Sequence, residues 1–149
     1  MIPWRQLLMA TALATVTLIE VPAYAQQIVQ IGRDSSERKA ILDVARVPIE
    51  RRLGIKVVFV VGRITTYGSW AFAALHPRNA AGNRIDYRQT RYAKDFISDQ
   101  DSDHFGVLLQ RKGGAWALVE SAFLPTDVYW IEWQKKYKLP EALFMTGAD

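Results

Sequence analysis

Residues 54–77 form the most strand-like segment of the chain, and they constrain its fold more than any other stretch. Residues 57–61 read VVFVV, and β-branched and aromatic side chains of this kind suit a pleated, packed surface. A turn signal around Gly68 separates this run from a second apolar run at residues 70–75. Two strand runs joined by a short glycine-containing loop predict a β-hairpin.

A second hairpin is predicted near the C-terminus. Two apolar runs, residues 105–110 and 115–124, are separated by the sequence RKGG. A Gly-Gly pair between two such runs is a strong hairpin signal. In the first hairpin, Trp70 and Phe72 stand two residues apart, so we expect their side chains to share one face of the sheet.

A helix is predicted before the first hairpin. Asp34 is suited to cap its first turn, and Glu37 stands three residues on, as in a capping box. Gly54 is suited to end the helix, because glycine adopts the left-handed backbone conformation common there. Pro48 lacks the N–H that would bond to Val44, so a kink or a break is expected there. The apolar face recurs at three- and four-residue spacing and consists of Ile41, Leu42, Val44, Ala45, Val47, Ile49 and Leu53.

A second helix, rich in aromatic residues, is predicted at residues 128–138. Thr126 or Asp127 would cap it, and Leu139-Pro140 ends it, because the residue before a proline disfavours helix. An aromatic helix face usually covers a core, and the alternative is a surface that stacks on sugars or peptides. We expect at least one of its four large aromatic residues to be substantially exposed and to contact any ligand: Tyr129, Trp130, Trp133 and Tyr137. Residues 140–144 are expected to add a short turn that packs against the body.

A helix followed by two antiparallel hairpins predicts an α+β fold. The economical arrangement is a curved antiparallel sheet of about four strands wrapped around the N-terminal helix, with the aromatic helix at the C-terminal end. The length of 149 residues suits a single domain, which we assign to residues 26–149.

Three runs of the sequence resemble a group of small exported bacterial proteins of unknown function. They are ERKAILDVARVPIERRLGIKVVFVVGRITTYGSWAFAALHP, the short run IDY at residues 85–87, and GVLLQRKGGAWALVESAFLPTDVYWIEWQKKYKLP. The resemblance implies a cystatin-like architecture, similar to the nuclear-transport-factor-like and ketosteroid-isomerase-like cones. It implies no particular activity, because that superfamily includes enzymes, ligand binders and interaction modules.

Residues 1–25 have the features of a secretory signal peptide. Arg5 precedes an apolar run at residues 7–19, and Ala23-Tyr24-Ala25 fits the cleavage pattern of small residues. The apolar run is shorter than the ~20 residues that span a bilayer. We therefore expect cleavage after Ala25, a periplasmic or secreted protein, and no stable membrane span in the mature chain.

The composition excludes several classes of function. The chain has no cysteine, which rules out disulfides, zinc–thiolate sites and thiol catalysis. Its net charge of +4 is too diffuse to indicate a nucleic-acid partner. The acidic run at residues 99–103 begins like a calcium loop but lacks the glycine and glutamate of an EF-hand, so a solvated loop is expected, and a weak divalent-metal site is the alternative. We expect no cofactor and no dedicated metal site.

The leading functional hypothesis is an exported binding or interaction module without catalytic activity. Its partner would be a small molecule, a cell-wall component or a periplasmic protein, and a homodimer remains open. The expected ligand-binding residues are the large aromatics of the first hairpin and of the last helix: Trp70, Phe72, Tyr129, Trp130, Trp133 and Tyr137.

The alternative hypothesis is a small-molecule enzyme of the ketosteroid-isomerase-like cone type. Glu120 is its candidate acid–base residue, because alternation puts it on the same face as Trp116 and Leu118, where burial would raise its pKa. His76 and His104 lie near strand ends, but no nucleophile-elbow or HExxH motif accompanies them.

The assignment of residues 1–25 as a signal peptide predicts that the mature protein begins at Gln26. N-terminal sequencing or the intact mass of the exported protein checks this, and a chain that still carries Met1 in the membrane fraction would contradict it.

Overall fold

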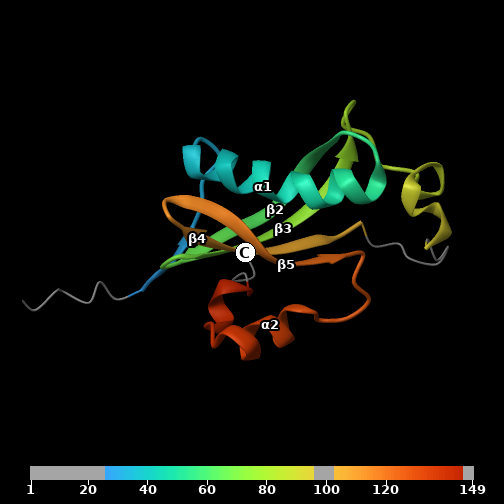
Figure 1. Cartoon of the computed structure of the whole chain (residues 1–149). Helices are drawn as coiled ribbons and strands as arrows, with labels where there is room; N and C mark the ends of the chain where they lie inside the picture. Colours follow the sequence, from blue (N-terminus) through green and yellow to red (C-terminus); the bar gives the residue numbers. More distant parts are fainter. Residues whose placement is uncertain (1–25, 96–102, 146–149) are drawn as a thin grey trace, which may run out of the picture.

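The computed structural model describes residues 26–95 and 103–145, so the predicted signal peptide lies outside the described residues. Five antiparallel strands form one sheet in sequence order, and helices α1 and α2 lie on opposite faces of it (Figure 1). The α+β class is confirmed, with a short edge strand added to the four that were expected. The elements are β1 (Ile28–Gln30), α1 (Ser36–Leu53), β2 (Val57–Tyr67), β3 (Trp70–Asn79), β4 (Phe105–Lys112), β5 (Ala115–Phe123) and α2 (Trp130–Tyr137).

Helix α1 begins one residue later than the predicted cap. The N-cap is Ser35, whose hydroxyl accepts a hydrogen bond from the Glu37 backbone N–H at 3.2 Å, so the predicted capping box on Asp34 is wrong. The helix runs unbroken through Pro48, so of the two predicted outcomes, a kink or a break, the break is wrong. Its buried residues recur every four positions on both sides of the proline and hold both halves on the sheet: Ile41, Ala45, Ile49 and Leu53. Gly54 ends the helix with a φ of 71°, as expected.

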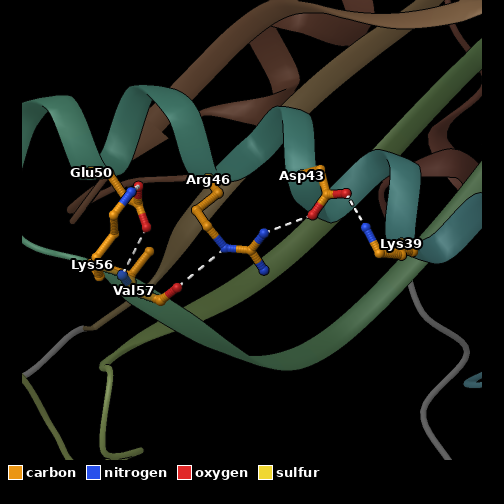
Figure 2. Close-up of polar contacts among 6 residues, drawn as sticks. All are labelled: Lys39, Asp43, Arg46, Glu50, Lys56 and Val57. Carbon is orange, nitrogen blue, oxygen red and sulfur yellow. Dashed lines mark hydrogen bonds and ion pairs between the residues drawn. The ribbon is translucent and has the colours of Figure 1, made fainter.

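Side chains of α1 also bond to the first residue of β2 (Figure 2). Arg46 Nε donates to the Val57 carbonyl at 3.2 Å, and the Val57 N–H donates to Glu50 Oε1 at 3.0 Å. Strand β1 pairs only with residues 65–67, at the other end of β2. The helix therefore satisfies backbone groups at a part of the strand edge that β1 does not reach.

A β-bulge in β2 decides which face each of its side chains occupies. Val61 is paired with Leu75, and Arg63 with Ala74, so Gly62 is the extra residue. Before the bulge, residues 57, 59 and 61 pack toward α1. After it the alternation is reversed, and Arg63 lies on the α2 face opposite Ala74.

A second bulge lies in β5. Leu108 is paired with Glu120, and Leu109 with Leu118, which leaves Val119 as the extra residue. Trp116 and Leu109 belong to the α1 core, whereas Leu108 belongs to the α2 core. The prediction that Glu120 shares a face with Trp116 is therefore wrong, because one inserted residue moves every later side chain to the other face.

Both faces of the sheet are covered. Between α1 and the sheet the space is filled by buried apolar side chains, among them Ile49, Ala73 and Val107. On the other face α2 and a short 3-10 turn, η3 (Glu141–Leu143), pack on the sheet. The expected C-terminal turn is thus confirmed. The shared face of Trp70 and Phe72 is also confirmed, because both pack in the α2 core.

Two further 3-10 turns, η1 (Tyr87–Gln89) and η2 (Arg91–Lys94), close the end of the sheet near the last turn of α1. The Arg52 guanidinium lies 5.4 Å from the Tyr92 ring centroid and 5.3 Å from that of Phe123. These cation–π contacts join α1, η2 and β5.

The segment that leads into α2 packs closely on the sheet at Gly106 in β4. A Cβ atom at this position would overlap the hydroxyl and ring atoms of Tyr129, which immediately precedes α2. The glycine therefore allows the tyrosine ring to lie directly on the strand backbone.

We predict that Gly106→Ala lowers the free energy of unfolding by about 1–3 kcal/mol, as overpacking does. Gly32→Ala is the matched control, because a Cβ at Gly32 meets no atom within 4 Å, and it should change stability by less than about 0.5 kcal/mol. Urea denaturation of both variants measures the difference. Equal midpoints for Gly106→Ala and the wild type would show that Tyr129 does not pack on this strand.

Candidate functional site

A small pocket lies between the start of α2 and the sheet. Its volume is about 200 Å³. We call it the Arg63 pocket, after the charged residue of its sheet wall. It is lined by Arg63, Phe72, Ala74, His104, Asp127, Val128, Tyr129, Trp130 and Phe144. Of the six aromatic residues predicted to bind a ligand, Phe72, Tyr129 and Trp130 therefore meet at this pocket.

Arg63 is half-buried and only partly satisfied. Its Nη2 donates to the Phe144 carbonyl, and its guanidinium carbon lies 5.6 Å from the centroid of the Phe72 ring. Its Nη1 is buried and has no hydrogen-bond partner among residues 26–95 and 103–145. Burial lowers the pKa of Arg63, but an arginine side chain stays protonated at neutral pH. The pocket wall therefore carries a cation with unused hydrogen-bonding capacity.

Within the part of the chain that the structure describes, Arg63 also has no carboxylate partner. None of the ion pairs there includes it. The nearby ionisable groups are His104 and Tyr129, whose titration the Arg63 charge influences.

His104 and Tyr129 form a neutral hydrogen-bonded pair in the pocket. The distance from His104 Nε2 to the Tyr129 hydroxyl is 2.5 Å. Burial is the main cause that lowers the pKa of His104, and the neighbouring His76 lowers it further. Burial likewise raises the pKa of the Tyr129 hydroxyl above its ordinary value. At neutral pH the pair can donate and accept hydrogen bonds without adding charge to the site.

A second polar cluster lies beside the pocket. Asp103 accepts hydrogen bonds from His76 Nδ1 at 2.7 Å and from Arg78 Nη1 at 2.5 Å. Burial raises the pKa of Asp103, but these hydrogen bonds outweigh burial and hold it below its ordinary value. The His76 and His104 rings meet edge to face, with centroids 5.8 Å apart. The cluster of Asp103, His76 and Arg78 thus borders the histidine side of the Arg63 pocket.

Asp127 lies at the rim of the Arg63 pocket and is exposed. The predicted capping of α2 by Thr126 or Asp127 is wrong, because the N-cap is Tyr129, with no side-chain cap bond. The Asp127 carboxylate makes no hydrogen bond or ion pair with any of the described residues.

The other predicted binding residues lie away from this pocket. Trp70 packs on Tyr137 with ring centroids 5.0 Å apart, and Trp133 is buried against Tyr129. The prediction that at least one large aromatic residue of this helix is substantially exposed is also wrong. Trp133 is 8% exposed, and the side chains of Tyr129, Trp130 and Tyr137 are half-buried. Helix α2 is therefore a core helix whose first turn forms one wall of a pocket.

Glu120 also lies away from the Arg63 pocket, next to α2. Its Oε1 accepts hydrogen bonds from Lys136 Nζ at 2.7 Å and from the Tyr137 hydroxyl at 2.6 Å. Lys136 first, and then Tyr137, lower the pKa of this carboxyl, whereas the enzyme hypothesis expected a raised pKa. The expected direction of the shift is thus wrong.

Neither threonine hydroxyl of β2 is paired with His76 or His104 as a nucleophile would be with its base, because both donate to backbone carbonyls. The Thr65 hydroxyl donates to the Leu143 carbonyl at 2.6 Å, and the Thr66 hydroxyl donates to the Val29 carbonyl. No cluster of three or more potential metal ligands occurs among residues 26–95 and 103–145. Of the acidic run at residues 99–103, only Asp103 lies within the described residues.

Sequence reasoning missed Arg63 as a site residue. One signal was present, because Arg63 is the only charged residue in the run VVFVVGRITTY of β2. The preceding Gly62 was the second signal, because a glycine inside a strand often marks a bulge.

The lowered pKa of His104 predicts acid sensitivity. The folded protein binds this proton less readily than the unfolded chain, so stability is lost as the pH falls below the unfolded-state value of about 6.5. Asp103 affects stability at a lower pH than His104 does. The stability that its lowered pKa contributes is lost only as the pH falls through about 3.9 and below.

We therefore expect the wild type to lose more stability between pH 7 and pH 5 than His104→Gln, measured by urea denaturation at each pH. Tyr129→Phe is the control, because it removes the hydroxyl but keeps the titrating imidazole, and it should retain the larger loss. Equal losses for wild type and His104→Gln would contradict the assignment.

Comparisons with known proteins add no relative from which a role could be transferred. No family model, curated protein or solved structure matches the chain. Among the described residues, no helix has both the length and the apolar character needed to cross a membrane. The inference about function therefore starts from the geometry of the Arg63 pocket.

Proposed function

We propose that the protein is an exported binding module that takes a small organic carboxylate in the Arg63 pocket. The observation that carries this proposal is the Arg63 guanidinium, a half-buried cation whose Nη1 has no partner among the described residues. Buried charges in proteins are normally paired, because removing them from water is costly. A ligand carboxylate would supply the missing charge and the missing acceptor.

The chemistry of the wall suits such a ligand. A guanidinium presents its N–H groups in a planar fork that matches the two oxygens of a carboxylate. Phe72 and Trp130 add aromatic surface beside this charge. The volume of about 200 Å³ is below the ~300–1,000 Å³ of sites for drug-sized ligands, which favours a small molecule.

Binding is better supported than catalysis. The space between α1 and the sheet is filled with apolar side chains, whereas a cone enzyme needs an open cavity there with a buried ionisable group. The hydrogen bonds from Lys136 and Tyr137 favour the ionised form of Glu120, which makes it a weaker base near neutral pH.

The proposal includes a cystatin-like fold and a periplasmic or secreted location. The fold is supported by one long N-terminal helix packed on an antiparallel sheet. The location is supported by the charged start, apolar run and cleavage pattern of residues 1–25.

The proposal predicts that benzoate binds to the wild type and that benzamide, its uncharged counterpart, binds far more weakly. Arg63→Gln should weaken benzoate binding by about tenfold or more, which corresponds to ~1.4 kcal/mol. Arg63→Lys keeps the charge but loses the planar fork, so it should have an intermediate effect. Isothermal titration calorimetry measures the affinity of the wild type, Arg63→Gln and Arg63→Lys for benzoate.

Arg88→Gln is the matched control, because Arg88 is an exposed arginine paired with Asp86 on η1, and it should bind benzoate as the wild type does. Thermal melting must show that each variant is folded. Failure of the folded wild type to bind benzoate, or equal affinities for wild type and Arg63→Gln, would disprove the proposal.

A further inference from the structure

Two opposite charges line the Arg63 pocket, and neither is neutralised within the described part of the chain. Arg63 belongs to the sheet wall and is half-buried, whereas Asp127 lies at the exposed rim, before α2. Arg63 has no ion-pair partner among residues 26–95 and 103–145, and Asp127 makes no side-chain hydrogen bond there. An inner cation and an outer anion therefore line one small pocket, each without an ion-pair partner among the described residues.

The two charges do not neutralise each other. An ion pair requires a nitrogen and an oxygen within 4.0 Å, and no such pair joins Arg63 to Asp127. Both residues nevertheless line the same pocket of about 200 Å³. The two charged residues therefore border the same small space without forming an ion pair.

The remaining walls are uncharged at neutral pH. Burial favours the neutral forms of His104 and Tyr129, and a hydrogen bond joins the two side chains. Phe72, Trp130 and Phe144 form an aromatic group in which the Trp130 and Phe144 rings stack with centroids 5.5 Å apart. The lining therefore combines one cation, one anion and an apolar surface.

We infer that the ligand is a small zwitterion with an apolar body, and that its chemical class is the α-amino acids with apolar side chains. This inference rests on the proposed function and adds the ammonium group to the carboxylate. The carboxylate would bind Arg63, the ammonium would bind Asp127, and the side chain would lie on the aromatic wall. A ligand of this kind neutralises both charges at once without adding net charge to the site.

Three probes that differ by one charged group test the inference. L-leucine carries both charges, N-acetyl-L-leucine lacks the ammonium, and L-leucinamide lacks the carboxylate. We expect leucine to bind the wild type about tenfold more tightly than either derivative, and Asp127→Asn to abolish the preference for leucine over N-acetyl-leucine. Arg63→Gln should weaken leucine and N-acetyl-leucine alike. Calorimetry gives the affinities, and quenching of Trp130, compared with Trp130→Phe, reports whether binding occurs at this pocket.

Glu132→Gln is the matched control, because Glu132 is an exposed carboxylate in the first turn of α2 that does not line the Arg63 pocket, and it should leave the preference intact. If the wild type bound leucine and N-acetyl-leucine equally well and Arg63→Gln weakened both, the ligand would not be a zwitterion. The carboxylate proposal would then still stand. A leucine preference that survives in Asp127→Asn would also overturn the zwitterion. Absence of carboxylate binding to the folded wild type would overturn both proposals.

Discussion

The structure depends on the burial of the central strand β3 on both of its faces. Ala71, Ala73 and Leu75 pack under α1, while Phe72 packs under α2 and η3. A sheet with two apolar faces needs a cover on each, and the loss of either cover would expose large apolar surface to water. This requirement explains why the last aromatic helix is a core element and why its rings are at most half exposed. The cover over the second face is short, and a pocket remains where the start of α2 meets β2 and β3.

Much of the fold could be predicted from local patterns, because both hairpins and both helices have clear periodicity and turn residues. The two bulges were not predicted, because a single inserted residue leaves the hydrophobic pattern on each side of it intact, although Gly62 gave a local signal for the bulge in β2. Strict alternation from Val57 would place Arg63 on the α1 face with Phe59 and Val61. The extra residue Gly62 places it on the α2 face instead. The same mechanism in β5 moved Glu120 away from the face of Trp116.

The site was only partly predictable for the same reason. Phe72, Tyr129 and Trp130 were expected from aromatic content alone, and they do line the pocket. Their charged neighbour Arg63 depends on the strand register, which the sequence does not encode in any short motif. The hydrogen bond between His104 and Tyr129 joins residues 25 positions apart, so only the packing of α2 on β4 reveals it.

Two departures from ordinary local chemistry meet at this pocket. An arginine occupies the α2 face of a strand that has no other charged residue, and a helix begins without a side-chain cap although Asp127 stands two residues before its N-cap. Each departure is unfavourable by itself, because a cation is partly desolvated and the orphan N–H groups of a helix end lose an available acceptor. Natural sequences usually obey such local rules and break them chiefly at functional sites. Both exceptions border one pocket and leave opposite charges there, so the proposed zwitterionic ligand would account for both at once.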